Sequence, residues 1–184
     1  LTIQPGTFVL GGPRVDDPTA LIITTSAKIN AQGTRSRPII MTSAQPFGSR
    51  SREDWGGLVM LGKARLNVAG GTAFIEGLDN RPYLQYGGTD DTHDCGSLAY
   101  VRVEYGGSVF TVNNEINSFT WGACGSKTVA HHLQAHYGKD DTFEWFGGTA
   151  DLKYAVGSYG ADDYADWQLG WRGRVQYLVG VQHP

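Results

Sequence analysis

Six acidic residues recur in two similar segments and are the first candidates for chemistry. Residues 140–148 read Asp-Asp-Thr-Phe-Glu-Trp-Phe-Gly-Gly, and residues 162–170 read Asp-Asp-Tyr-Ala-Asp-Trp-Gln-Leu-Gly. Both fit the pattern Asp-Asp-x-x-acid-Trp-x-x-Gly, so that Asp162 repeats the position of Asp140. If the two segments lie directly on each other, about 5 Å apart, the acids form one column. Its members are Asp140, Asp141, Glu144, Asp162, Asp163 and Asp166.

Three kinds of chemistry suit such an acidic column. The plainest is structural, because Asp-Asp favours turns in which the side chains accept hydrogen bonds from backbone amides. Like charges this close also repel and raise pKa values unless a cation intervenes, and calcium is the hard cation that oxygen ligands favour. Two carboxyl groups about 5 Å apart further match the catalytic pair of a retaining glycosidase. The sequence leaves the three open, in that order of preference.

Aromatic residues repeat in the same way. The spacing predicts a ladder of Tyr105, Tyr137 and Tyr159, and a second ladder of Trp145 and Trp167. Such ladders commonly stack inside a β-solenoid. The alternative is an exposed platform of Trp145, Trp167, Tyr137 and Tyr159 that binds sugar rings beside the acids.

Histidines and arginines near the repeat do not form an obvious catalytic set. On a strand, His131 and His132 are expected to face opposite sides, and His132 and His136 to lie about 13 Å apart. One zinc ion would therefore not take them, and a solvated strand face is predicted. Arg172 and Arg174 are expected in surface ion pairs, and would serve a lyase only if they turned toward the acids.

The two cysteines, Cys95 and Cys124, are too few for a disulfide scaffold or a four-ligand zinc site. They precede the apolar segments that start at Leu98 and Ala130. If these segments stack on each other as successive turns of the chain, the two cysteines fall in loops of neighbouring turns. A disulfide is predicted, with two buried thiols as the alternative. A disulfide would fit an oxidising compartment.

The elements that must position these residues are short strands. Glycine contributes 26 of 184 residues, roughly twice its average share, and Gly-Gly pairs separate short runs of apolar and β-branched residues. One apolar pattern returns four times, as Leu98-x-x-Val101, Ala130-x-x-Leu133, Leu152-x-x-Ala155 and Val175-x-x-Leu178. These units are too short for propeller blades. They predict a right-handed parallel β-helix of roughly eight coils in one domain, 1–184, with an insertion around residues 112–115. A Greek-key sandwich is the competing fold.

Composition and charge exclude several classes of protein. The formal net charge is −3, so no basic surface is expected for a nucleic acid. No apolar run approaches the ~18 residues of a membrane span. Nucleotide-binding and hydrolase motifs of the Gly-x-Gly-x-x-Gly or Gly-x-Ser-x-Gly type are absent from the sequence. The chain begins on a strand-like segment, Leu1–Ile3, which we interpret as a processed chain or a fragment without upstream coils.

Further segments point to a family. Residues 1–7 (LTIQPGT), 55–62 (WGGLVMLG) and 100–105 (YVRVEY), with the acidic repeat, resemble a bacterial family of secreted and surface right-handed parallel β-helix proteins, lipoproteins among them. The resemblance covers nearly the whole chain. It implies the fold and an extracytoplasmic location, secreted or at the cell surface, but no activity. The chain departs from the family by lacking the leading coils and by carrying two cysteines in loops.

Two functions follow from this reading. A solenoid has two open ends with unpaired strand edges, and both ends of this sequence read as strands. The first hypothesis is a structural or binding protein that assembles with itself or with other surface proteins through these ends. The second is a polysaccharide-acting lyase or hydrolase, or a carbohydrate-binding module, that uses the acidic and aromatic edge, with calcium as the only expected cofactor.

Overall fold

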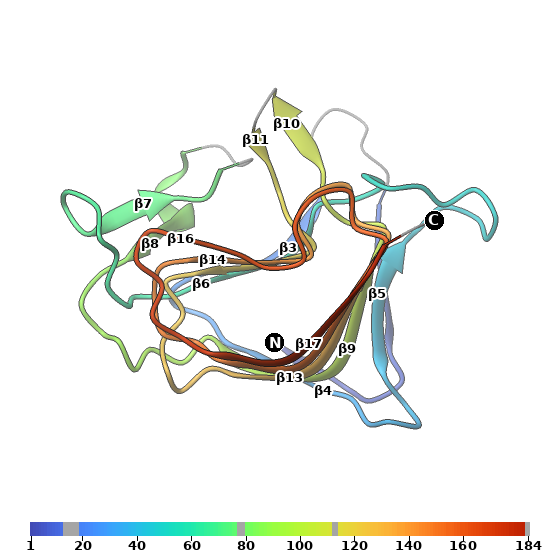
Figure 1. Ribbon diagram of the computed structural model, residues 1–184, viewed down its shortest axis with the longest axis horizontal. Coiled ribbons are helices and arrows are strands. Elements are labelled where there is room, and N and C mark those ends of the chain that lie inside the picture. The colour runs from blue at the N-terminus through green and yellow to red at the C-terminus, as the bar shows by residue number, and fades with distance from the viewer. Residues whose placement is uncertain (13–18, 77–79, 112–113, 183–184) are drawn as a thin grey trace.

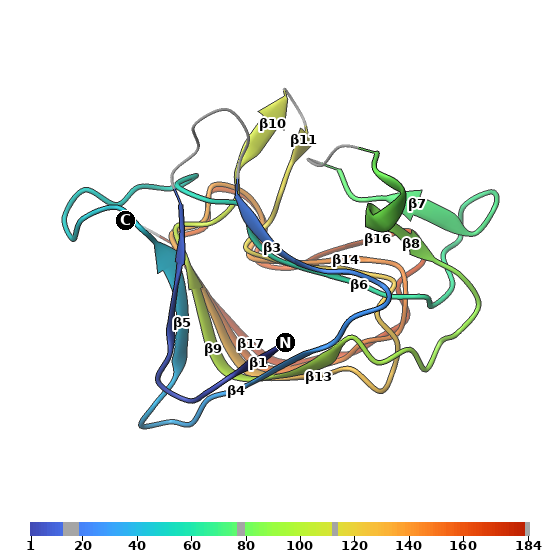
Figure 2. The same cartoon turned by 180° about the vertical axis from the view of Figure 1, so that it is seen from behind.

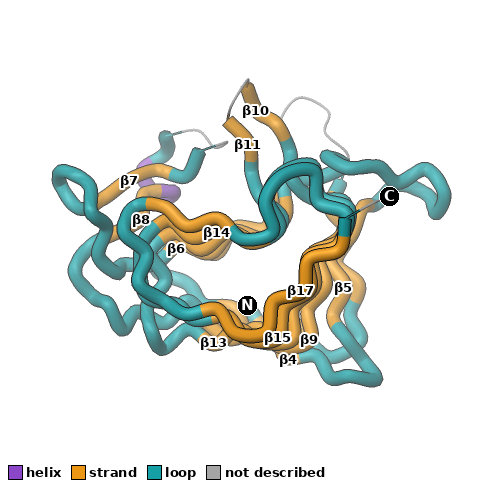
Figure 3. Tube along the Cα trace, viewed as in Figure 1, coloured by secondary structure: helices purple, strands orange, loops and turns teal. Residues whose placement is uncertain are grey.

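Two parallel sheets wind around one core in a right-handed β-helix (Figures 1 and 2). The computed structural model describes residues 1–12, 19–76, 80–111 and 114–182. Figure 3 shows that strands and loops make up nearly all of this part, with one short helical turn. No helix in the described ranges is both long and apolar enough for a membrane crossing.

The strands fall into two stacked sheets and two inserted hairpins. The first sheet runs β1 (Thr2–Ile3), β4 (Ile29–Gln32), β9 (Gly96–Glu104), β13 (Val129–His136), β15 (Leu152–Ser158) and β17 (Val175–Val181). In the same sheet, β5 (Ile39–Ser43) also pairs with β9, and β2 (Phe8–Gly11) pairs with β5. The second runs β3 (Ala20–Ile23), β6 (Gly57–Leu61), β12 (Phe119–Gly122), β14 (Phe143–Phe146) and β16 (Asp166–Gln168). The antiparallel hairpins are β7 (Thr72–Phe74) with β8 (Gln85–Gly87), preceded by the 3-10 turn η1 (Pro82–Leu84), and β10 (Val109–Thr111) with β11 (Asn114–Glu115).

The register of the last coils is the one that the repeat predicts. Leu133 pairs with Val101 on one side and with Ala155 on the other, and Ala155 pairs with Leu178. Every pairing within the two stacked sheets is parallel. The Greek-key alternative was therefore wrong, because that fold requires antiparallel neighbours.

The predicted number of roughly eight coils is not confirmed, and the main path of the first sheet stacks six strands. Insertions take up the remaining length: Asn30 pairs with Ser97, although β7, η1 and β8 all lie between them in the sequence. The insertion expected around residues 112–115 is the site of the β10–β11 hairpin. Val112 and Asn113 of that prediction lie outside the described residues.

Stacked aromatic rings fill the interior. Phe119 lies over Phe143 with ring centres 5.3 Å apart, and Trp121 lies parallel to Trp145 at 5.1 Å. The predicted Trp145–Trp167 ladder was wrong. Although the two backbones are in register, the ring that covers Trp145 belongs to Trp171, at 4.9 Å.

Two columns of aromatic residues break the strand alternation on the first sheet. Each residue has a positive φ, between 49° and 64°, a region that non-glycine residues seldom adopt. The first column, called the aromatic column below, is Tyr100, His132, Tyr154 and Tyr177 in the middle of β9, β13, β15 and β17. The second follows the ends of the first three of these strands and is Tyr105, Tyr137 and Tyr159. Each left-handed residue bends the strand, so side chains on either side of the bend no longer alternate.

Candidate functional site

The acids predicted from the repeat line one pocket of about 310 Å³. Its lining comes from β14 and β16 of the second sheet, from the segment after β7 and from the β10–β11 hairpin, and Figure 1 shows β7 and this hairpin on the outer side of that sheet. Its lining residues, called the acidic pocket below, are Glu76, Glu115, Asn117, Asp140, Asp141, Glu144, Asp162, Asp163, Asp166 and Gln168.

Coil stacking brings the acids of neighbouring coils together. Glu144 on β14 is the register partner of Asp166 on β16. Asp141 Oδ1 accepts a 2.9 Å hydrogen bond from the backbone N–H of Asp163 in the next coil, which is the turn chemistry expected of Asp-Asp. Carboxylate oxygens that lie within 4.8 Å of one another form two groups, Asp140–Asp141–Asp162 and Asp141–Glu144–Asp166. Asp141 belongs to both groups and therefore occupies the centre of the pocket.

Four lining residues were missed by the sequence reading. Gln168 lies two residues after Asp166 on the same strand, so strand periodicity alone could have placed it. Asn117 precedes β12 in the coil below. Glu76 and Glu115 belong to the inserted segments, and no repeat relates them to the other acids. Only the folded chain shows that these insertions extend the acidic pocket.

Burial and mutual repulsion raise the pKa values of the acids. Burial, then the charges of Glu115 and other acids, raise the pKa of Asp140 to about 6. Burial and the neighbouring Asp140 raise the pKa of Asp141 to about 7. For Glu144, burial followed by repulsion from Glu76 and Asp141 raises the pKa to about 9. The carboxylate form of these groups thus lacks sufficient positive charge around it.

Two amide side chains fix the orientation of Glu144. Asn117 Nδ2 donates to Glu144 Oε2, and Gln168 Nε2 donates to Glu144 Oε1 over 2.8 Å. Asn117 also accepts the backbone N–H of Asp141 at 3.2 Å. Both oxygens of Glu144 thus accept a hydrogen bond from an amide side chain, and these two bonds fix the carboxyl group in the pocket.

The donor set fits a hard cation. Carboxylate and amide oxygens from several segments converge on the pocket, and calcium takes six to eight such oxygens. Within the described residues, the pocket lining includes no Lys, Arg or His side chain. Arg172 instead binds Asp91 at 2.9 Å, and Arg174 binds Asp151 at 2.6 Å. The two arginines are thus in ion pairs, as expected, and their partners are not residues of the acidic pocket.

The aromatic candidates are less accessible than a sugar platform requires. The Trp145 side chain is 1% exposed and has rings on both faces. Tyr137 lies 6.2 Å from Tyr159, so the tyrosine ladder is present, but the Arg52 guanidinium covers Tyr137 at 4.7 Å. Trp167 is 59% exposed, at the end of the second sheet. Trp145 is therefore excluded as a sugar-binding surface.

The histidines do not lie as a regular strand would place them. His131 Nδ1 and His132 Nδ1 are 2.9 Å apart, so the expectation that they face opposite sides was wrong. The cause is the positive φ of His132 (53°), which turns its side chain to the same side as that of His131. His136 is separate, and its Nδ1 lies 2.9 Å from Ser158 Oγ.

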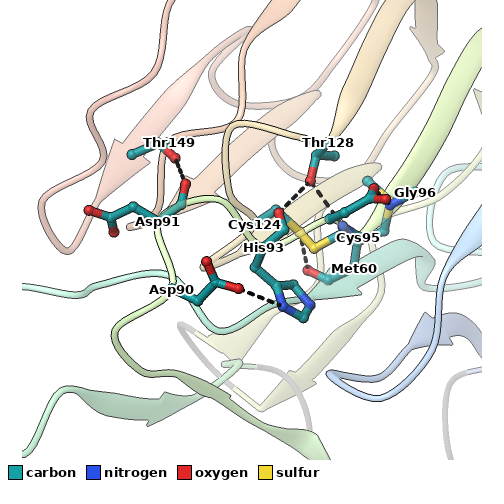
Figure 4. The surroundings of a disulfide bond; sticks show 10 residues. Met60, Asp90, Asp91, His93, Cys95, Gly96, Cys124, Thr128 and Thr149 are labelled. Carbon is teal, nitrogen blue, oxygen red and sulfur yellow. Dashed lines mark hydrogen bonds and ion pairs between the residues drawn. A yellow bond between two sulfur atoms is a disulfide. The ribbon is translucent and has the colours of Figure 1, made fainter.

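The predicted disulfide is present. Cys95 and Cys124 are bonded, with Cα atoms 5.7 Å apart, and Figure 4 shows the bond beside Thr128 and His93. Thr128 Oγ1 accepts the backbone N–H of Cys95 at 3.0 Å. The bond joins the loops that precede β9 and β13, which are neighbouring coils. It fits a protein of an oxidising compartment.

The comparison with known families agrees with this architecture. No curated protein and no solved structure matches the sequence. Residues 1–184, the whole chain, match a family described as a pectate-lyase like beta helix domain. The parallel register, the two stacked sheets and this match lead to one assignment: the chain belongs to the pectate-lyase-like β-helix family.

Proposed function

We propose that this protein is an extracytoplasmic β-helix that binds an anionic polysaccharide with the help of calcium held in the acidic pocket. The observation that carries the proposal is the convergence of eight carboxyl groups on one pocket with no basic side chain in its described lining. Family membership supports a polysaccharide as the ligand class. The disulfide supports the location.

The calcium would be held around Asp141. The two groups of carboxylate oxygens share this residue, and their members come from two coils. A bound divalent cation would lower the raised pKa values of Asp140, Asp141 and Glu144 by stabilising their charged forms. The calcium would supply positive charge that the described lining of the pocket lacks.

The ligand class follows from charge. A uronate polymer would be repelled by the acidic pocket alone, so its attachment requires a bridging cation. Calcium prefers carboxylate oxygens and suits such a bridge.

Binding rather than cleavage fits the side chains best. A lyase needs a basic residue beside the cation, and Arg172 and Arg174 are paired with Asp91 and Asp151 instead. Amide hydrogen bonds to both oxygens of Glu144 fix this carboxyl group against Asn117 and Gln168. The described lining of the acidic pocket therefore supports cation binding more than catalysis.

Calorimetry with polygalacturonate, in calcium or in chelator, tests the proposal. We expect calcium to bind the protein alone, and polygalacturonate to bind only when calcium is present. Asp141→Asn should lose both, whereas Asp151→Asn, a partly exposed acid outside the acidic pocket, should keep both. Absence of calcium binding would refute the metal site. Calcium binding without polygalacturonate binding would refute the ligand class, and new absorbance from unsaturated products would show a lyase.

Exposed apolar ends favour a second function, end-to-end assembly with another copy. Large side chains are exposed in the last coil, with Trp167 at 59%, Tyr177 at 60% and Val179 at 53%. The first coil exposes Phe8 at 64% and Leu10 at 57%. In the described sheets, β17 and β1 each pair on one side only. These edges would join β17 of one copy to β1 of the next.

Sedimentation over a wide range of concentrations tests end-to-end assembly. We expect the chain to associate, and Val179→Lys to weaken the association because a lysine on an edge strand opposes pairing with another strand. Val129→Lys, which also changes an exposed apolar residue (45% exposed) but in an inner strand, is the matched control. A chain that stays monomeric at every concentration would refute this second function.

A further inference from the structure

Two histidine side chains on the outer face of the first sheet present paired nitrogen atoms. His131 Nδ1 and His132 Nδ1 are 2.9 Å apart, and their rings are nearly perpendicular, with an interplanar angle of 85°. The two residues are called the histidine pair below. The pair lies on β13, in a different sheet from the strands of the acidic pocket.

The aromatic column holds the pair in place before any ligand binds. The His132 ring lies between Tyr100, at 4.5 Å, and Tyr154, at 4.6 Å. His131 meets the edge of Tyr100 at 6.3 Å. Left-handed backbone at His132 (φ 53°) turns the second imidazole toward the first. The column thus keeps the two imidazoles next to each other before a metal binds, which lowers the cost of bringing the two ligands together.

We propose that the histidine pair binds a divalent transition metal of tetragonal geometry, Cu²⁺ above all, through the two Nδ1 atoms. Adjacent ligands at 90° around such an ion, each about 2.0 Å from it as for imidazole nitrogen on zinc, would be about 2.8 Å apart. The same bond length at a tetrahedral angle would require about 3.3 Å. The observed 2.9 Å matches the tetragonal case, which Cu²⁺ and Ni²⁺ prefer.

The proton shared by the two Nδ1 atoms can move away, so that a metal ion replaces the hydrogen bond between the histidines. At 2.9 Å, one Nδ1–H donates to the other Nδ1 in the metal-free pair. On binding, that proton moves to Nε2 of its own ring, and the two rings turn so that both Nδ1 lone pairs, which lie along the N···N line in the hydrogen bond, face the ion.

The coordination positions that the pair does not fill face a pocket. A pocket of about 470 Å³ is lined by both histidines together with Thr128, Asp151, Lys153 and Tyr154. Among the described residues, no third His, Cys, Asp or Glu ligand atom completes a group with the pair. The Asp151 carboxylate is already bound by Arg174. Water or a small exogenous ligand would thus occupy the other positions.

The two cation sites differ in ligand chemistry. The acidic pocket offers oxygen ligands, which suit calcium, whereas imidazole nitrogen suits copper, nickel and zinc. Divalent ions follow an affinity order in which copper exceeds nickel at nitrogen sites. Saturation with calcium therefore occupies the acidic pocket and leaves the histidine pair for copper.

Copper titration of the full chain in excess calcium tests the proposal. We expect one Cu²⁺ per chain, with an electron paramagnetic resonance spectrum showing hyperfine coupling to two imidazole nitrogens. His131→Gln and His132→Asn should each weaken binding by about tenfold or more, a loss of at least about 1.4 kcal/mol. His136→Gln is the matched control, because His136 lies on the same strand and binds Ser158; it should leave the affinity unchanged.

Equal copper affinity in the wild type and His131→Gln would overturn the proposal. A variant that fails to fold, as judged by circular dichroism, does not leave the question open, because the wild type offers a second readout. Copper should broaden the imidazole nuclear magnetic resonance signals of His131 and His132 before that of His136. Broadening of His136 first, or of none of the three, would equally refute the site.

Discussion

The acidic pocket and the aromatic column are built by the same device and have opposite energetics. In each, successive coils place side chains of one kind over each other. In the aromatic column, Tyr154 stacks on Tyr177 at 5.0 Å and 11°, a contact that stabilises the fold. In the acidic pocket, the stacked groups repel, and Asp141 and Glu144 have pKa values raised to about 7 and about 9.

This difference shows which column serves the fold and which needs a ligand. A repeat propagates whatever residue it carries, so stacking by itself does not distinguish structure from function. Rings favour their neighbours, whereas carboxylates do so only when a cation lies between them. A local arrangement that costs stability is expected at a functional site rather than in a scaffold. The acidic pocket is therefore the stronger candidate for the protein's activity.

Calcium should produce the largest effect on stability, because a bound cation would remove the repulsion between the carboxylates of the acidic pocket. At a concentration 100-fold above its dissociation constant, a ligand that binds only the folded state stabilises it by about 2.7 kcal/mol. For a chain of this length, that corresponds to a rise in Tm of roughly 5–10 °C. Thermal unfolding in calcium and in chelator measures the change.

Two variants connect the calcium effect to the acidic pocket. Asp141→Asn removes the charge shared by both oxygen groups but keeps an oxygen that accepts the Asp163 N–H. This variant should therefore fold, and calcium should raise its Tm only slightly. Asp151→Asn lies outside the pocket and should respond like the wild type. An equal Tm rise in all three proteins would mean that calcium acts elsewhere.

The pH dependence of stability gives the next largest effect. A carboxyl group with a raised pKa holds a proton in the folded state that it loses in the unfolded state, so stability falls as pH rises toward the folded pKa. Between pH 7 and 9, this applies to Glu144, with a pKa of about 9. Ordinary histidines are already neutral there. The metal-free protein should lose up to about 1.4 kcal/mol per pH unit for one such proton.

Denaturant unfolding in chelator from pH 7 to pH 9 measures this slope. Glu144→Gln should flatten the curve, because the group that titrates is gone. Tyr154→Phe changes the aromatic column alone and should keep the wild-type slope. A wild-type curve that stays level or rises over this range would contradict the raised pKa of Glu144.

The sequence predicted most of the last coils residue by residue. The acidic and apolar repeats placed Glu144 opposite Asp166 and Leu133 opposite Ala155, as the structure has them, because no insertion interrupts those coils. The predicted coil number was not confirmed, for the opposite reason. Between Asn30 and Ser97 the inserted segments hide the repeat, and these also carry Glu76, which completes the acidic pocket.

Backbone geometry accounts for the other failures. Strand alternation predicted opposite faces for His131 and His132, but a positive φ at an aromatic position has no sequence signature comparable to glycine. The Trp ladder failed because residue spacing sets backbone register and not ring position. Trp171, which donates its indole N–H to the Ala150 carbonyl at 3.1 Å, covers Trp145 from a turn.

Removing one ring from the aromatic column should change stability less than calcium binding or a rise in pH does. Tyr154 stacks on Tyr177 and lies against His132, and each aromatic pair contributes about 0.5–1.5 kcal/mol. Because Tyr154 is 41% exposed, little buried surface is lost besides, and Tyr154→Ala should cost about 1.5 kcal/mol. Tyr177→Ala should cost less, since that ring has one stacking partner. Denaturant unfolding measures both, with Tyr154→Phe as the control that keeps the ring. If Tyr154→Ala unfolds like the wild type, the column adds no stability, and its contrast with the acidic pocket is lost.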